Sequence, residues 1–213
     1  MAYSNNFRTL EGFKTPYGIT GSKFARSACP EEMTAEFKKE LISKGYKTVL
    51  DMRRNEEVAR KKSGYSDFNY MHIPLIDTKY TVKSELPLRG KEYYRRCLRE
   101  KENLAKIFRF LANCETGVIY HCAGGKSRTG VVTALLLSLV KVSEAEIVAD
   151  YCRSYLELYG QTVYNEKAPL GERDITLFLT LVYNNFLSIE NFLKYTGVTA
   201  AEIQKIKKRL IAN

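Results

Sequence analysis

Two residues have the types and the spacing that phosphate chemistry requires. Cys122 and Arg128 lie six positions apart and enclose a glycine-containing segment, which an apolar run precedes and a longer apolar run follows. This order predicts a buried strand, a tight loop and a buried helix. Glycines let the N–H groups of such a loop turn toward one point, and N–H groups at the start of a helix bind anions. The predicted phosphate-binding residues are Ala123, Gly124, Gly125, Lys126, Ser127, Arg128 and Thr129.

The predicted loop would also activate its cysteine. Amide N–H groups and a guanidinium group stabilise negative charge, so we expect a low pKa for Cys122 and a thiolate that attacks phosphorus. The planar guanidinium of Arg128 suits two phosphate oxygens. A lone buried cysteine is often structural. The complete string His-Cys-x-x-Gly-x-x-Arg-Thr-Gly nevertheless favours a catalytic loop, whereas Gly-Lys-Ser at 125–127 matches only the end of a nucleotide-binding P-loop.

The composition is that of a globular protein with anionic partners. The chain has 213 residues, 45% hydrophobic and 27% charged, and we expect a single domain over residues 1–213. The net charge of +10 indicates anionic partners, but its carriers are scattered, so charge alone does not choose among them. Five cysteines without a Cys-x-x-Cys pair, together with two histidines, argue against a disulfide framework and a zinc site. We therefore expect no metal and no cofactor.

The amino terminus shows no targeting signal. Its first residues are polar and lack the apolar core of a signal peptide, and no apolar run approaches the length of a membrane span. We expect a cytoplasmic protein, although the sequence is also compatible with secretion by a route that needs no cleaved signal. No nucleic acid partner is expected, and any membrane contact is expected to be peripheral.

Apolar periodicity places the loop in an α/β fold. A helix is expected from Thr34, which can cap it, to about Gly45, and buried strands are expected over 47–53 and 70–75. Residues 78–90 are irregular and form either a flap over the site or a plain surface loop. Further helices are expected over 91–113 and through the last third, with capping boxes that begin at Ser143 and Thr199. The predicted architecture is a central, mostly parallel sheet flanked by helices, with a helical carboxy-terminal part.

Beyond the loop, the sequence resembles the atypical bacterial tyrosine phosphatases, some of which also dephosphorylate serine, threonine and phosphoinositides. The stretch at 6–12 is similar to the family's opening Asn-Phe-Arg-Asp-Leu-Gly-Gly, and the stretch at 48–53 is similar to its strand ending in Asp-Leu-Arg. The resemblance runs nearly end to end, because further matching segments lie at 24–27, 188–193 and 197–199. It implies a fold like that of the cysteine-dependent tyrosine phosphatases, which agrees with the independent prediction.

The resemblance also implies an activity and a substrate class. It implies an enzyme that hydrolyses phosphomonoesters through a cysteinyl-phosphate, acting on phosphorylated proteins, phosphoinositides or inositol phosphates. In related phosphatases the residue at Thr129 assists the thiolate. His121 is expected to brace the loop rather than to transfer protons. In this family the residue at Lys126 accompanies phosphoinositide activity, and the alternative is that its side chain points to solvent.

One departure from the family concerns the general acid. The family loop reads His-Cys-x-x-Gly-Lys-Asp-Arg-Thr-Gly, its aspartate has been assigned the role of general acid, and Ser127 takes that place here. Asp77 is predicted to replace that aspartate as the general acid, because it follows a strand and precedes the irregular stretch. Asp51 is the rival, and its alternative role is a buried ion pair with Arg53 or another arginine.

Two other classes of function stay open. A phosphate-binding module without turnover would explain Ser127, but the intact Cys122 and Arg128 oppose it. A redox or sulfur-transfer enzyme would also place a cysteine in an anion-binding loop. No second cysteine lies within a few residues of Cys122, which makes a resolving disulfide less natural.

Overall fold

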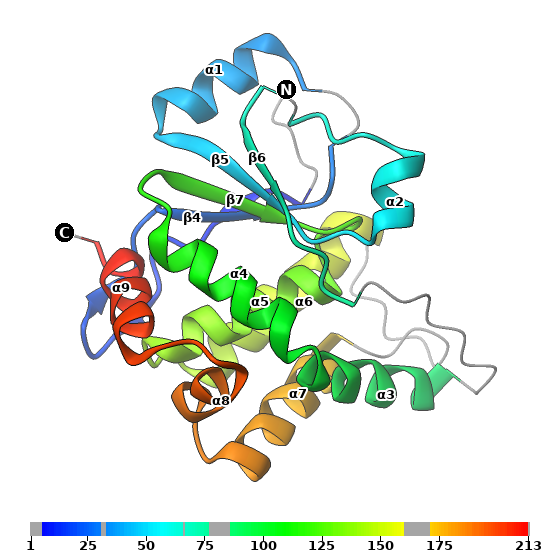
Figure 1. Ribbon diagram of the computed structural model, residues 1–213, viewed down its shortest axis with the longest axis vertical. Coiled ribbons are helices and arrows are strands. Elements are labelled where there is room, and N and C mark those ends of the chain that lie inside the picture. The colour runs from blue at the N-terminus through cyan, green and yellow to red at the C-terminus, as the bar shows by residue number, and fades with distance from the viewer. Residues whose placement is uncertain (1–5, 31–32, 66, 77–85, 160–170, 213) are drawn as a thin grey trace.

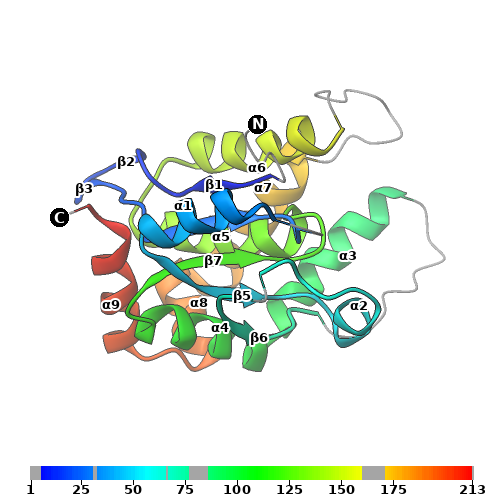
Figure 2. The ribbon, with the colours of Figure 1, turned by 90° about the horizontal axis from the view of Figure 1, so that it is seen from above.

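A five-stranded sheet with helices on both faces forms the centre of the molecule (Figures 1 and 2). The computed structural model describes residues 6–30, 33–65, 67–76, 86–159 and 171–212. The strand order is β1-β4-β7-β5-β6, with only β1 antiparallel, so the predicted mostly parallel sheet is confirmed. The strands are β1 Arg8–Thr9, β4 Phe24–Ser27, β5 Tyr46–Asp51, β6 Asn69–His72 and β7 Gly117–His121, and a separate hairpin pairs β2 Lys14–Thr15 with β3 Gly18–Ile19.

The central strand is β7, and its position follows from its composition. All five of its residues are buried, as expected for a strand that is covered on both faces. In the register of the parallel strands, His121 lies opposite Ser27 of β4 and opposite Asp51 of β5. All three strands therefore end at one edge of the sheet, the edge at which α/β proteins bind their ligands.

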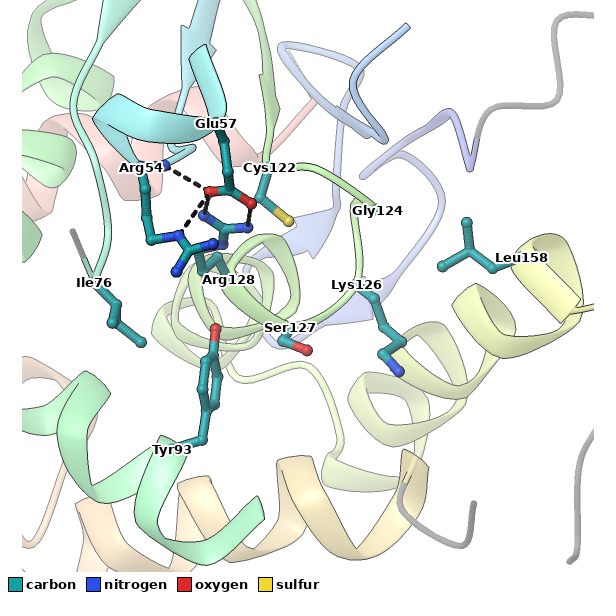
Figure 3. Close-up of a pocket in the computed structure, with 10 residues that line it drawn as sticks. All are labelled: Arg54, Glu57, Ile76, Tyr93, Cys122, Gly124, Lys126, Ser127, Arg128 and Leu158. Atoms are coloured by element: carbon teal, nitrogen blue, oxygen red, sulfur yellow. Dashed lines mark hydrogen bonds and ion pairs between the residues drawn. The ribbon is translucent and has the colours of Figure 1, made fainter. Parts of the chain in front are cut away.

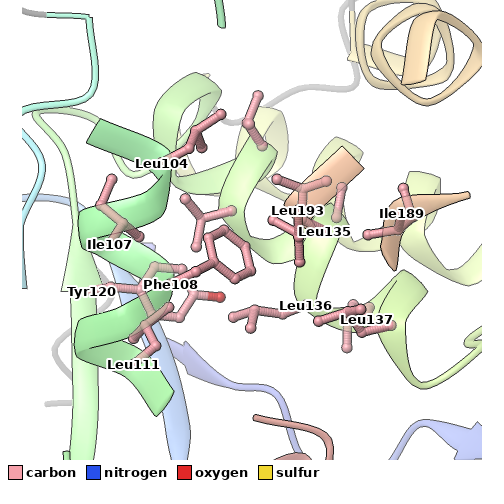
Figure 4. Close-up of a cluster of buried hydrophobic side chains, with 14 of the residues drawn as sticks. Leu104, Ile107, Phe108, Leu111, Tyr120, Leu135, Leu136, Leu137, Ile189 and Leu193 are labelled. Carbon is pink, nitrogen blue, oxygen red and sulfur yellow. The ribbon is translucent and has the colours of Figure 1, made fainter. Parts of the chain in front are cut away.

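The helices form two unequal layers (Figure 1). One face of the sheet is covered by α1, through a small cluster that includes Leu41, Val49 and Ile119. The other face carries the main core, in which side chains of β7, α4, α5 and α8 meet (Figure 4). The helices are α1 Ala35–Ser43, α2 Asn55–Arg60, α3 Leu86–Arg99, α4 Lys101–Asn113, α5 Ser127–Leu139, α6 Glu144–Tyr159, α7 Gly171–Phe186, α8 Ile189–Thr196 and α9 Ala200–Leu210. No helix in the described part of the chain is long and apolar enough to cross a bilayer.

Helix caps are confirmed, but one helix boundary is wrong. The Thr34 hydroxyl accepts a hydrogen bond from Phe37 N at 3.2 Å, and the capping box at Thr199 is present. At Ser143 the hydroxyl accepts from Glu146 N at 3.3 Å and donates to the Glu146 carboxylate at 2.6 Å. The helix expected over 91–113 is two helices, which separate at Glu100. Of the irregular stretch, residues 86–90 belong to α3, while residues 77–85, including Asp77, lie outside the described residues. Pro87 fits the first turn of α3, because no helical partner exists there for the N–H that proline lacks.

Helix α5 carries the loop, and Gly130 sets how closely α6 approaches it. Residues 129–137 of α5 are all buried, which matches their nearly continuous apolar sequence. An added Cβ on Gly130 would lie 2.4 Å from ring carbons of Tyr151. The Tyr151 ring is fully buried, and its hydroxyl pairs with the Tyr94 hydroxyl at 2.5 Å. The ring therefore has little freedom to move aside.

We predict that Gly130→Ala destabilises the fold by about 1–3 kcal/mol, because the new methyl group overpacks the contact with Tyr151. Gly124→Ala is the matched control in the same motif. Its added Cβ would come no nearer than 3.6 Å to Leu158, so its cost should stay below about 1 kcal/mol. Chemical denaturation of both variants measures the difference. Equal losses would show that Gly130 does not limit the packing of α5 against α6.

Candidate active site

The loop that follows β7 runs between the ends of β4 and β5 and leads directly into α5 (Figure 3). Gly125 makes this path possible. Its φ of +64° lies in the left-handed region, and an added Cβ would come within 2.4 Å of Ser27 O. Only glycine fits such a conformation this close to a neighbouring strand. The sequence signal for a tight loop is thus explained by one glycine against β4.

The carbonyl groups of the loop are held on its outer side. Asn6 Nδ2 donates to both Gly124 O and Gly125 O at 3.1 Å, and Arg26 Nη2 donates to Gly125 O at 2.7 Å. The backbone N–H of Cys29 donates to Ala123 O at 2.9 Å. The C=O and N–H of a peptide unit point in opposite directions. Outward carbonyls therefore leave the following N–H groups directed toward the interior of the loop.

A buried ion cluster supports Arg26. Asp150 of α6 accepts from Arg26 Nη1 and from Arg8 Nε, at 2.5 Å each, and Ser154 Oγ accepts from both guanidinium groups at 3.1 Å. Burial alone would raise the pKa of Asp150, but Arg26 and Arg8 outweigh it and lower that pKa. Two guanidinium groups on one carboxylate leave an excess positive charge behind the loop, where it favours an anion.

Cys122 lies at the bottom of the loop and is 3% exposed. Burial alone would raise the pKa of this thiol. Arg128, the Thr129 hydroxyl and the backbone N–H groups of Thr129 and Gly125 outweigh burial, so the pKa of Cys122 lies below its ordinary value. Among the described residues the Thr129 hydroxyl has no hydrogen-bond partner of standard geometry, which leaves it available to the sulfur. The arrangement favours a thiolate.

Arg128 is fixed beside Cys122 by an acid that the sequence did not reveal. Its Nη1 and Nη2 donate to the two carboxylate oxygens of Glu57, at 2.5 and 2.9 Å (Figure 3). Burial alone would raise the pKa of Glu57, but Arg128 and Arg54 lower it to about 2. Glu57 therefore stays ionised and holds the guanidinium plane. The available signal was an acidic residue in the first turn of a helix that follows a strand at the edge of the site.

His121, Asp51 and Arg53 lie behind the loop and do not line the cavity. Asp51 accepts from Arg53 Nη2 at 2.7 Å and from the Tyr70 hydroxyl at 2.5 Å. Burial would raise the pKa of Asp51, yet His121, Arg53 and Tyr70 lower it. The ion pair considered as the alternative role of Asp51 is present. A carboxylate held in this way has no proton to give at neutral pH.

His121 is a neutral brace in this arrangement. Its Nδ1 lies 3.1 Å from Cys122 O, and its Nε2 lies 3.7 Å from Asp51 Oδ2, which is too long for a hydrogen bond. Complete burial lowers the pKa of His121 to about 4 despite the opposing influence of Asp51. At neutral pH the ring therefore carries no charge and forms no ion pair with Asp51.

A cavity of about 240 Å³ opens above Cys122 (Figure 3). The structure brings five of the predicted loop residues to it, while Asp77 lies outside the described residues. Lys126 Nζ lies 4.1 Å from the centre of the Tyr155 ring, so its side chain does not simply point to solvent. The lining residues are Arg54, Glu57, Ile76, Tyr93, Cys122, Gly124, Lys126, Ser127, Arg128 and Leu158.

A second carboxyl group near the loop was also missed by sequence reasoning. Asp174 of α7 interacts electrostatically with Lys126, and burial outweighs that lysine and raises the pKa of Asp174 to about 7. It lies one helical turn before Phe178, whose ring is 6.0 Å from that of Tyr94. The chain leading to α7 gives no motif that would single this residue out.

The comparison with known protein families decides the classification. The model of the tyrosine phosphatase family matches residues 1–212. The chain belongs to this family. Its members are phosphoric monoester hydrolases, and the resemblance seen in the sequence is thereby confirmed. A tyrosine-protein phosphatase of Nostoc commune is 27% identical over 221 residues, which cover 90% of this chain and 75% of that protein.

Solved phosphatase structures resemble this family member more distantly. The core catalytic domain of the PP-IP phosphatase SIW14 from S. cerevisiae is 17% identical with a TM-score of 0.45, and the match covers 88% of this chain and 94% of that chain. TpbA of P. aeruginosa is 15% identical with a TM-score of 0.41, over 89% of this chain and 97% of that chain.

We predict that His121 makes the stability of this phosphatase family member fall at acidic pH. The pKa of His121 is about 4 in the folded protein and about 6.5 in an unfolded chain, so the unfolded state binds the proton first. Its contribution is fully present above pH 6.5 and is lost as the pH falls to about 4. Over this range the wild type should lose roughly 3 kcal/mol more unfolding free energy than His121→Asn, as measured by urea denaturation. Parallel curves for the two proteins would refute a buried neutral histidine.

Proposed function

We propose that this chain is a cysteine-dependent phosphomonoester hydrolase that works through a cysteinyl-phosphate. The observation that carries the proposal is a buried cysteine with a lowered pKa at the centre of inward-facing N–H groups, beside a fixed guanidinium. The Cys122 sulfur attacks phosphorus while the bond to the leaving oxygen breaks. The loop N–H groups and Arg128 stabilise the charge on the equatorial oxygens. Water then cleaves the sulfur–phosphorus bond and releases phosphate.

The walls of the cavity favour an aryl phosphate, in particular phosphotyrosine. Ile76, Tyr93 and Leu158 provide apolar surface above the loop, and Cys122 lies at the bottom, where a long aromatic side chain reaches it. Smaller phosphoserine and phosphothreonine side chains would leave this apolar surface uncovered. Activity on phosphoinositides is a further proposal, which the resemblance at Lys126 suggests and the excess of positive charge at the cavity supports.

The proton donor is proposed from two carboxyl groups, because Ser127 has none and Asp51 is held ionised by Arg53. Asp77 stays the prediction from its sequence position. Asp174 is the second candidate, since a pKa of about 7 leaves much of it protonated near neutral pH and its interaction with Lys126 places it near the loop.

The alternatives are less well supported. A binding module without turnover does not require a low pKa at Cys122. A redox role would need a second reactive thiol, and Cys29 is the cysteine whose backbone bonds to the loop. Burial raises the pKa of Cys29, which makes its sulfur a poor nucleophile. Hydrolysis uses the lowered pKa of Cys122, the loop N–H groups and the fixed guanidinium of Arg128 together.

We predict that Cys122→Ser abolishes hydrolysis of aryl phosphates and leaves phosphate binding measurable. A serine hydroxyl does not ionise near neutral pH and so cannot replace the thiolate, whereas the N–H groups of the loop and Arg128 are unchanged. Turnover by the wild type should also depend steeply on the pKa of the leaving group. The test is a steady-state assay over a series of aryl and alkyl phosphates, with phosphate binding followed by calorimetry. Activity that survives in Cys122→Ser would overturn the proposed nucleophile, and a wild type that binds phosphate without turnover would be a binding module.

The same substrate series separates the candidate acids. Replacement of the true acid, in Asp77→Asn or Asp174→Asn, should cost roughly 10²–10⁴-fold on alkyl phosphates and far less on activated aryl phosphates. Ser127→Asp should flatten the dependence on the leaving group. If neither asparagine variant slows alkyl phosphates, both carboxyl groups are removed from the mechanism.

A further inference from the structure

Arg54 lies at the start of α2 and lines the cavity next to Arg128, although the two residues belong to distant parts of the chain. Its backbone N–H and its Nε both donate to Glu57 Oε2, at 2.7 and 3.3 Å. These bonds fix the base of the guanidinium. Its two Nη atoms form no hydrogen bond or ion pair with any residue that the structure describes, and the side chain is 26% exposed. Within the described part of the chain, these donors are therefore unpaired on a side chain that lines the cavity.

Glu57 sets the spacing between the two guanidinium groups (Figure 3). Its Oε2 accepts from Arg128 Nη1 at 2.5 Å and from Arg54 Nε at 3.3 Å, so these two nitrogens can be no farther apart than the sum of the distances, 5.8 Å. One carboxylate thus faces two guanidinium groups. Because the pKa of Glu57 is about 2, its carboxylate stays ionised at neutral pH, and the two guanidinium groups share its single negative charge. The Arg54 guanidinium therefore lies beside that of Arg128 on the wall of the cavity that contains Cys122.

Lys126 is placed differently. Its ammonium packs on the Tyr155 ring of α6, on the opposite side of the cavity from Arg54 (Figure 3). Part of its charge is thus used in a cation–π contact. A second phosphate group beside a phosphate bound at Arg128 would therefore contact Arg54 before it contacted Lys126.

We propose that Arg54 binds a second phosphate group of the substrate, directly beside the phosphate that Cys122 attacks. The ligand class is a molecule with phosphates on neighbouring atoms or ring positions, either soluble or as a lipid headgroup. A single phosphotyrosine side chain lacks this second group. The inference rests on the proposed function, because it takes Cys122 and Arg128 as the site of the first phosphate. Guanidinium groups bind phosphate through paired, charge-assisted hydrogen bonds.

Binding of inorganic phosphate and pyrophosphate tests the inference without turnover. Calorimetry should show that the wild type binds pyrophosphate more tightly than phosphate. Arg54→Gln should lose roughly ten- to hundredfold in affinity for pyrophosphate and clearly less for phosphate. Arg60→Gln is the matched control, because Arg60 is an exposed residue at the end of the same helix and does not line the cavity. Equal losses for both ligands in Arg54→Gln, or the same selective loss in Arg60→Gln, would overturn the inference.

Turnover identifies the source of the second phosphate. Vesicles with phosphatidylinositol 4-phosphate or 4,5-bisphosphate give the lipid pair, and phenyl phosphate with catechol bisphosphate gives the soluble pair. In either pair, the wild type should hydrolyse the bisphosphate faster than the monophosphate. Arg54→Gln should reduce this preference and Arg54→Lys should keep part of it, and such a result in at least one pair supports the inference. If the preference for the bisphosphate disappears in Lys126→Met but persists in Arg54→Gln, Lys126 binds the second phosphate and the inference about Arg54 is overturned.

The two proposals fail in different ways. Pyrophosphate binding that depends on Arg54, without turnover of any phosphate ester, would keep the inference and refute the proposed hydrolase. If aryl phosphates are hydrolysed but Arg54 has no effect on the preference for bisphosphates, the proposed hydrolase activity stands and the inference about Arg54 is refuted.

Discussion

The structure depends on holding the carbonyl groups of the loop between β7 and α5 away from Cys122. Asn6, Arg26 and the backbone of Cys29 take these carbonyls, so the N–H groups converge on the sulfur. The arrangement requires Arg26 to be fully buried, and a buried charge without a partner is strongly destabilising. Asp150 supplies the partner for both Arg26 and Arg8. The first strand, the fourth strand and α6 are thereby tied to one loop.

The charges on the two sides of the loop have different tasks. Behind it, the buried cluster of two arginines and one aspartate fixes the backbone and leaves an excess positive charge. In front of it, Glu57 orients Arg128 and also contacts Arg54, so a single carboxylate sets the geometry of two cations. This front arrangement explains how a strongly basic cavity keeps Arg128 in place before a substrate arrives. It also means that the short helix α2 belongs to the site as much as the loop does.

The sequence predicts the loop well because its chemistry is local. Cys122, Gly125, Arg128 and Thr129 lie within one turn-and-helix unit, so their spacing determines the geometry. Glu57 and Asp150 could not be found in this way, since their contacts arise from the order of the strands and the approach of α2 and α6. The division of the predicted helix at Glu100 was missed because neither glycine nor proline marks it, and apolar spacing continues on both sides. For Asp51 the sequence left two roles open, a general acid and a buried ion-pair partner of an arginine, and the structure shows the ion pair with Arg53.

The central claim is that the outward bonds to the loop carbonyls, by directing loop N–H groups toward the sulfur, help Arg128 and Thr129 to hold Cys122 as a thiolate. It is tested most directly by the pH dependence of alkylation of the Cys122 peptide by iodoacetamide, followed by mass spectrometry in the wild type and in Asn6→Gly. Glycine keeps the left-handed backbone of Asn6, whose φ is +55°, while it removes the amide that binds the two carbonyls. The account predicts a pKa for Cys122 below that of an ordinary cysteine in the wild type, and a higher pKa in the variant. An ordinary or raised pKa in the wild type, or the same low pKa in both proteins, would contradict it.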